Sequence, residues 1–191
     1  MNKLLLLSGL IFMIACADNS AGDHDHTNHD TITSQVKDTS KKSLPAEATA
    51  SIGGSNLKIS YHAPAVRGRT IWGGLVPYDE VWVTGAHSAT TLEVNTGFRI
   101  GDKMIPAGKY ALFTIPSKEA WTVIINKNWE QHLADEYSEA DDVVRVKVKP
   151  VVLTETVERL RYQIVQAGTN TGTIDISWEK IKISFPVEIR K

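Results

Sequence analysis

The sequence predicts an all-β domain over residues 50–191, built as an antiparallel β-sandwich that resembles a jelly roll. Apolar side chains recur at every second position, which is the period of a strand with one buried face. Turns rich in glycine and proline separate these short runs. No long amphipathic helical pattern interrupts them. Two sheets with one apolar face each bury those faces by packing against each other.

The expected strands follow one another from Leu57 to Val187. Each alternates apolar and polar residues, so each has one buried and one wet face. Short strands are expected at residues 81–84, 90–94, 109–115 and 121–126. Tryptophans that fall within strand patterns and are expected in the core are Trp82, Trp121 and Trp178. Later residues expected to face inward are Val144, Val146, Val148, Leu160, Tyr162, Ile164, Ile174, Ile176 and Ile183.

One segment, residues 128–140, breaks the strand pattern and predicts a short helix. Leu133 and Tyr137 are four residues apart, which places them on one side of a helix. The rest of the segment is polar and acidic. We therefore expect a wet helix that covers an open end of the sandwich.

The N-terminal residues 1–16 predict a lipoprotein signal peptide. Lys3 precedes an apolar run that is too short to span a bilayer permanently and that ends at Cys16, the only cysteine. Residues 13–16 resemble a bacterial lipobox, which implies acylation of that thiol and a membrane partner. We expect secretion across the inner membrane and lipid anchoring in the cell envelope, on its periplasmic or outer-membrane face. The alternative is an ordinary cleavage site beside a buried cysteine.

The next segment, residues 17–49, predicts a flexible tether. It contains too few large apolar side chains to offset the chain entropy of folding. Net charge is −1 for the full chain, and removal of Lys3 with the signal peptide leaves −2. No global positive field favours nucleic acid, so we expect no nucleic-acid partner. Acylation of Cys16 would leave no thiol for a disulfide.

Four separated motifs in the domain resemble those of one family. They are residues 61–78 (YHAPAVRGRTIWGGLVPY), 81–90 (VWVTGAHSAT), 105–116 (IPAGKYALFTIP) and 121–126 (WTVIIN). In this order they are similar to the DUF2911 family of secreted proteins and lipoproteins of Bacteroidota, over about residues 50–190. The family pattern has Trp-Arg-Thr-Gly-Ala-Asn-Glu where this chain has Trp-Val-Thr-Gly-Ala-His-Ser at residues 82–88. The resemblance implies no assigned activity.

The histidines are candidate metal ligands in two groups, one in the tether and one in the domain. His24, His26 and His29 lie among aspartates and could collect Zn, Cu or Ni weakly, or could be part of an inert spacer. His62, His87 and His132 lie beside turns, and three imidazoles with a water would make an open Zn or Cu site. Their separations of 25 and 45 residues match no familiar zinc spacing, so they could equally be ordinary loop histidines.

The segment from Arg67 to Gly74 predicts a ligand-binding loop. Arg67 and Arg69 could hold a carboxylate, phosphate or sugar against the ring of Trp72, while glycines allow close approach. In the competing interpretation Trp72 plugs the sandwich and the arginines bond backbone carbonyls.

The sequence favours binding over catalysis. Ser88 adjoins His87, but adjacent residues of an extended chain point to opposite faces, and no nucleophile elbow is present. We therefore expect a non-catalytic envelope lipoprotein that binds a small ligand, a metal or an envelope protein. One alternative is a metal-dependent enzyme in which Asp135 or Glu136 acts as base beside the domain histidines. Another is a purely structural envelope module.

Overall fold

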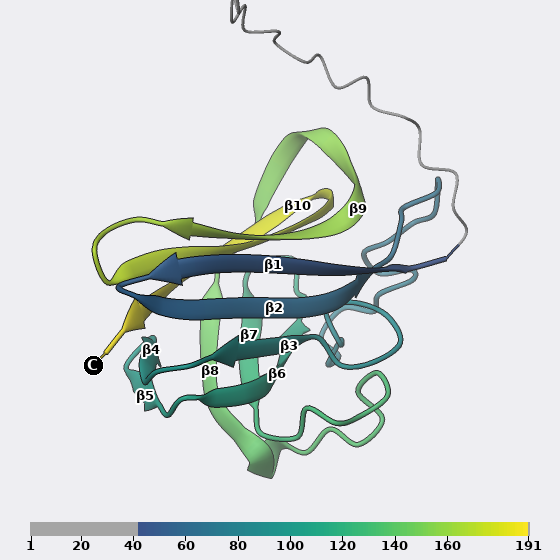
Figure 1. Ribbon diagram of the computed structural model, residues 1–191. Coiled ribbons are helices and arrows are strands. Elements are labelled where there is room, and N and C mark those ends of the chain that lie inside the picture. Colours follow the sequence, from purple (N-terminus) through teal and green to yellow (C-terminus); the bar gives the residue numbers. More distant parts are fainter. Residues whose placement is uncertain (1–41, 191) are drawn as a thin grey trace, which may run out of the picture. The chain divides into compact units, whose positions relative to one another are not determined.

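The protein is a sandwich of two antiparallel sheets, as the sequence predicts (Figure 1). A computed structural model describes residues 42–190, so Cys16 and the tether histidines lie outside the described residues. No described helix is long and apolar enough to cross a membrane. The strands are β1 (Leu44–Ile52), β2 (Ser55–Ala63), β3 (Thr91–Val94), β4 (Phe98–Ile100), β5 (Lys103–Ile105), β6 (Gly108–Ile115), β7 (Trp121–Asn126), β8 (Asp142–Val148), β9 (Val151–Gln166) and β10 (Thr171–Ile189).

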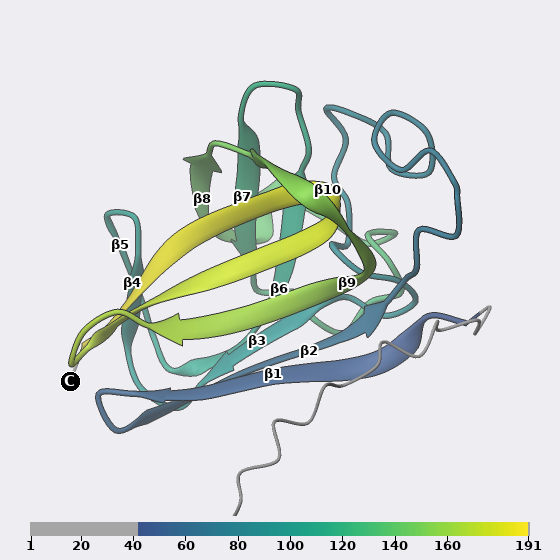
Figure 2. The ribbon, with the colours of Figure 1, turned by 90° about the horizontal axis from the view of Figure 1, so that it is seen from above.

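Six strands form one sheet in the order β1-β2-β3-β6-β7-β8, and four form the other in the order β5-β4-β10-β9. Figure 2 shows the β9–β10 hairpin lying across the larger sheet. Every pair of neighbouring strands is antiparallel. Hairpin connections explain the turn residues between the runs, because antiparallel neighbours need only a short reversal.

The core lies between the sheets and follows the predicted alternation. In β2, Leu57 and Ile59 are buried while Lys58 is exposed. All nine C-terminal residues expected to face inward belong to this core: five are buried, and Ile164 and the three valines of β8 are partly buried against it. Burial of each large aliphatic side chain contributes about 1.5–3 kcal/mol, so this layer is the main source of stability.

The long strand β10 changes its buried face at a bulge. Even-numbered residues such as Ile176 and Trp178 are buried before Glu179, and odd-numbered residues such as Ile183 are buried after it. Pairing with β9 shifts register on both sides of Glu179, whose φ is 53°. An extra residue in one strand moves the following side chains to the opposite face. The bulge thus keeps apolar groups in the core along the whole strand.

The sandwich begins earlier than residue 50. Residues 44–49, which the sequence analysis assigns to the tether, form most of β1 and pair with β2. The inward positions here include Ala46 and Ala48, which pack against the core although they are only partly buried. Small side chains give this strand a weak hydrophobic pattern, which explains why composition alone places the boundary too late.

The segment 128–140 does not form the expected helix. It is a loop that ends in a single 3₁₀ turn at Glu139–Asp141. The Leu133 N–H donates to the carbonyl of His87 at 2.6 Å, and the carbonyl of Gln131 accepts from Ala89 at 3.0 Å. The Leu133 N–H and the Gln131 carbonyl are therefore bonded to another loop and cannot form the hydrogen bonds of an α-helix. Pairing between loops overrides the local helical spacing of Leu133 and Tyr137.

Candidate functional site

A long irregular segment, residues 64–90, closes the end of the sandwich where β2 ends (Figure 1). It is tied to the β9 edge by two backbone hydrogen bonds, from Val66 N–H to the Glu158 carbonyl at 2.8 Å and from Leu160 N–H to the Pro64 carbonyl at 3.0 Å. Trp82 pairs with Thr114 of β6 through a backbone bridge. Long connections held on a rigid scaffold are frequent sites of binding.

Four tryptophans meet beneath this segment. The ring of Trp72 lies 5.7 Å from that of Trp82, 4.8 Å from that of Trp121 and 5.8 Å from that of Trp178, each in an edge-on arrangement. Trp82 and Trp178 are stacked, with centroids 5.6 Å apart and an interplanar angle of 19°. Trp72 therefore plugs the end of the sandwich, as the competing interpretation of the Arg67–Gly74 segment predicts.

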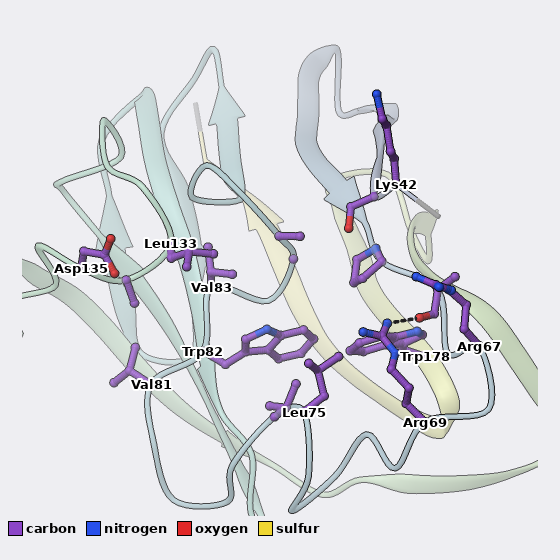
Figure 3. Close-up of a pocket in the computed structure, with 17 residues that line it drawn as sticks. Lys42, Arg67, Arg69, Leu75, Val81, Trp82, Val83, Leu133, Asp135 and Trp178 are labelled. Atoms are coloured by element: carbon purple, nitrogen blue, oxygen red, sulfur yellow. Dashed lines mark hydrogen bonds between the residues drawn. The ribbon is translucent and has the colours of Figure 1, made fainter. Parts of the chain in front are cut away.

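A pocket of about 520 Å³ opens above the stacked indoles (Figure 3). Trp82 and Trp178 both line it, together with the aliphatic side chains of Leu75, Val76, Val81 and Val83. Trp72 does not line it. The volume lies within the roughly 300–1,000 Å³ of small-molecule sites, and the mainly apolar wall is typical of them.

The charged residues of the pocket are separated. Figure 3 shows Arg67 and Arg69 beside Trp178, with Asp135 at the opposite side. Lys42 also lines the pocket. The side near Trp178 is therefore positive, and its two guanidinium groups suit a carboxylate or phosphate.

The two arginines are held by the loop itself. Arg69 donates from Nη2 to the Ala65 carbonyl at 2.5 Å and from Nε to the Val66 carbonyl at 3.2 Å. The backbone N–H of Arg67 donates to Glu158 Oε1 at 2.9 Å, and its φ of 53° belongs to a left-handed turn completed by Gly68 at 68°. Arg69 thus bonds backbone carbonyls, as the interpretation of this segment as a purely structural loop predicts. A guanidinium has five N–H donors, so Arg69 retains donors that a ligand could use.

The indole nitrogen of Trp178 has no hydrogen-bond partner among the described residues, and neither has that of Trp72. Buried indole N–H groups usually find an acceptor. Trp178 lines the pocket, so a ligand with an acceptor could use this donor after a small adjustment of the ring.

The domain histidines lie in one region but are held differently. The rings of His62 and His87 are 5.1 Å apart at 84°. His132 instead pairs its Nδ1 with Asp135 Oδ2 at 2.9 Å, and both of these side chains are about two-thirds exposed. Among residues 42–190 no group of three or more histidine, cysteine or carboxylate side chains is placed to hold one metal ion. The three-histidine site stays a prediction.

The β-bridge between Ser88 and His132 places these two residues opposite each other. Flanking hydrogen bonds from Leu133 to His87 and from Ala89 to Gln131 make them a non-hydrogen-bonded pair, in which side chains share a face. Sequence reasoning considered only the adjacent His87 as a partner for Ser88. The described residues show no hydrogen bond from the Ser88 hydroxyl.

His62 and His132 line a second hollow of about 810 Å³, with Trp129 on its wall. Partial burial lowers the pKa of His62, and the charge of a protonated His87 lowers it further. Both effects favour the neutral imidazole, which is the form that binds metals.

Lys109 Nζ lies 3.8 Å from the ring centroid of Trp129, so the lysine makes a cation–π contact that covers this indole.

Trp82 and Trp178 line the pocket, although the sequence indicated only a place in the core for them. Both fit the period-two pattern of core residues, and Trp178 is indeed only 2 % exposed. Their role in the pocket depends on how the 64–90 segment folds over the end of the sandwich. The one local signal is the interruption of the β10 alternation at Glu179, directly after Trp178.

These features define an all-β sandwich with an aromatic pocket at one end. The family model described as "Protein of unknown function (DUF2911)" matches residues 43–187, and the chain belongs to that family. No curated protein matches the chain. No solved structure matches it either.

Proposed function

We propose that this protein is a cell-envelope lipoprotein whose sandwich binds a small amphipathic anion without transforming it. The ligand combines a flat apolar body with a carboxylate or phosphate. The observation that carries this proposal is the pocket in which Arg67 and Arg69 lie beside the stacked indoles of Trp82 and Trp178. The lipid anchor at Cys16 rests on the sequence of residues 1–16.

The pocket matches each part of such a ligand. Aromatic rings favour offset stacking, which contributes about 0.5–1.5 kcal/mol beyond the buried area. A guanidinium pairs with an anionic group through charge-assisted hydrogen bonds of about 1.5–3 kcal/mol. The acidic Asp135 lies on the far side, so it does not repel an anion held by the arginines.

Binding without catalysis fits the chemistry of the lining. Asp135 is the only carboxylate among the described residues that line the pocket, and it is paired with His132. The remaining lining residues offer mainly apolar surface, the cationic side chains of Lys42, Arg67 and Arg69, and the hydroxyl of Ser43. Such a set orients an anion but supplies no acid and base pair around a reacting bond.

Isothermal titration calorimetry with indole-3-acetate and the neutral, isosteric indole-3-acetamide tests this proposal. We expect saturable binding of the acetate and at least about tenfold weaker binding of the amide, because the amide cannot form the charge-assisted hydrogen bonds. Arg67→Gln should bring the two affinities within about threefold of each other.

Arg161→Gln is the matched control, since Arg161 is exposed on β9 and does not line the pocket. This variant should retain the full preference for the acetate. Equal affinity of the wild-type protein for acetate and amide would contradict the proposal, as would the absence of saturable binding of either compound.

A further inference from the structure

We propose that His62 and His87 form a two-imidazole site for a divalent transition metal such as Cu²⁺ or Zn²⁺, separate from the aromatic pocket. The sequence analysis expects three histidine ligands. The structure supports two, because the rings of His62 and His87 are neighbours while no group of three metal-binding side chains among residues 42–190 is placed around one point.

The fold brings the two histidines together from distant parts of the chain. His62 is the penultimate residue of β2 and alternates with the core residues Tyr61 and Ala63, so it belongs to the outer face of the sheet. The loop that carries His87 packs directly on this strand end. A Cβ placed on Gly85 would lie 3.4 Å from the His62 carbonyl, which is van der Waals contact with the strand end, and 2.6 Å from Thr90 Oγ1, which is too close for a larger residue without a shift of Thr90.

His87 is fixed in position by its backbone. Its φ is 64°, and its carbonyl accepts from Leu133 N–H at 2.6 Å. A non-glycine residue holds this left-handed conformation only where the surroundings enforce it. The enforced turn sets the ring of His87 against that of His62.

The separation of the rings agrees with shared coordination. Two imidazoles bound to one tetrahedral ion through bonds of about 2.0–2.1 Å have ring centroids roughly 5 Å apart. The His62 and His87 centroids are 5.1 Å apart, and the rings are nearly perpendicular at 84°. His87 is exposed, so its side chain can change rotamer and turn a ring nitrogen toward an ion shared with His62.

The chemistry of the site suits a borderline metal. Neutral imidazole is a common ligand of divalent transition metals. His62 also lines the second hollow, which gives an ion and its remaining water ligands a path from solvent. Nitrogen ligands of this kind bind Cu²⁺ more tightly than Zn²⁺.

The test is calorimetric titration of the full chain, purified in detergent, with Zn²⁺ alone and then with Cu²⁺ alone. The background carries Asn in place of His24, His26 and His29, so that the tether contributes no imidazole. We expect one ion per chain and tighter binding of Cu²⁺. Loss of one of two ligands should weaken binding at least as much as the loss of a group that only hydrogen-bonds to a ligand, which typically costs about 10–100-fold, so His62→Asn and His87→Asn should each weaken binding at least about tenfold.

His132→Asn is the matched control and should leave the affinity within about twofold. A thermal melt of each variant confirms that it is folded. If all three variants bind as the background protein does, the ion is held elsewhere and the site is refuted. If His132→Asn loses as much as His87→Asn, the assignment to two histidines is wrong.

Discussion

The side chain of Arg69 shows how one residue can serve both the fold and a ligand. Its guanidinium donates to the Ala65 and Val66 carbonyls of an irregular segment. Substitution of Arg69 would therefore remove hydrogen bonds that hold the pocket loop as well as a cation that lines the pocket. We therefore place the test of anion binding on Arg67, whose substitution leaves these carbonyl bonds in place.

His62 should make the stability of the domain depend on pH. Its pKa in the folded protein is lowered, first by burial and then by His87, so the unfolded chain binds the proton more readily. The free energy of unfolding should therefore fall as pH decreases below about 6.5, and the loss is complete below the folded pKa. Urea unfolding at pH 7.5 and 5.5 measures this.

His62→Asn should reduce the difference between the two pH values, because the side chain that titrates is gone. His132→Asn serves as the comparison, since its ring is exposed and is not among the groups that lower the pKa of His62. An unchanged pH dependence in His62→Asn would contradict the prediction.

At the scale of elements, the β9–β10 hairpin depends on a close approach at its turn end. A Cβ on Gly172 would lie 2.3 Å from Ile52 Cδ1 and 2.9 Å from the Val165 carbonyl. Gly172→Ala should therefore destabilise the protein by about 1–3 kcal/mol, as overpacking of a filled site does. Chemical denaturation measures the change in the free energy of unfolding.

Gly68 provides the matched control. It has a positive φ of 68°, but a Cβ there would meet nothing within 4 Å. Gly68→Asn should cost no more than about 1 kcal/mol, because asparagine tolerates the left-handed conformation. Similar losses in the two variants would mean that the contact with Ile52 does not determine the effect at Gly172.

Most strands were predictable from sequence because apolar residues recur at every second position on the buried face. The strands β1, β4 and β5 were not foreseen, and residues 81–84, where a strand was expected, form only a bridge between Trp82 and Thr114. Even the two phases of β10 are visible, as Ile174 and Ile176 on one side of the bulge and Ile183 and Phe185 on the other. The loop at 128–140 was not, because its hydrogen bonds go to a segment some 40 residues earlier. Helical spacing is a weak preference, and tertiary pairing overrides it.

The site was predictable in part for the same reason. The Arg67 and Arg69 motif marked the pocket loop, since paired arginines and glycines are a local signal. The indole floor was not foreseen, because Trp82 and Trp178 are 96 residues apart and both read as core. The approach of His62 to His87 depends likewise on how the loop crosses the strand end.

At the scale of the whole molecule, Cys16→Ser tests the proposed anchor. Without an acylated thiol the processed protein should move from the membrane fraction to the aqueous envelope fraction. High-salt washing and fractionation followed by immunoblotting measure this, since salt removes proteins held only by charge. Continued membrane association of the variant in high salt would contradict lipid anchoring at Cys16.

The packing of Trp72, Trp82, Trp121 and Trp178 has an optical consequence. Ring centroids 4.8–5.8 Å apart couple the four chromophores, so excitation of one is shared by the others and the cluster emits as a unit. The stacked pair of Trp82 and Trp178 also forms the floor of the pocket, so an occupant touches the emitter directly. We therefore expect an occupant of the pocket to change the intrinsic emission and the aromatic circular dichroism without any added label, against a constant contribution from Trp129, which lies outside the cluster.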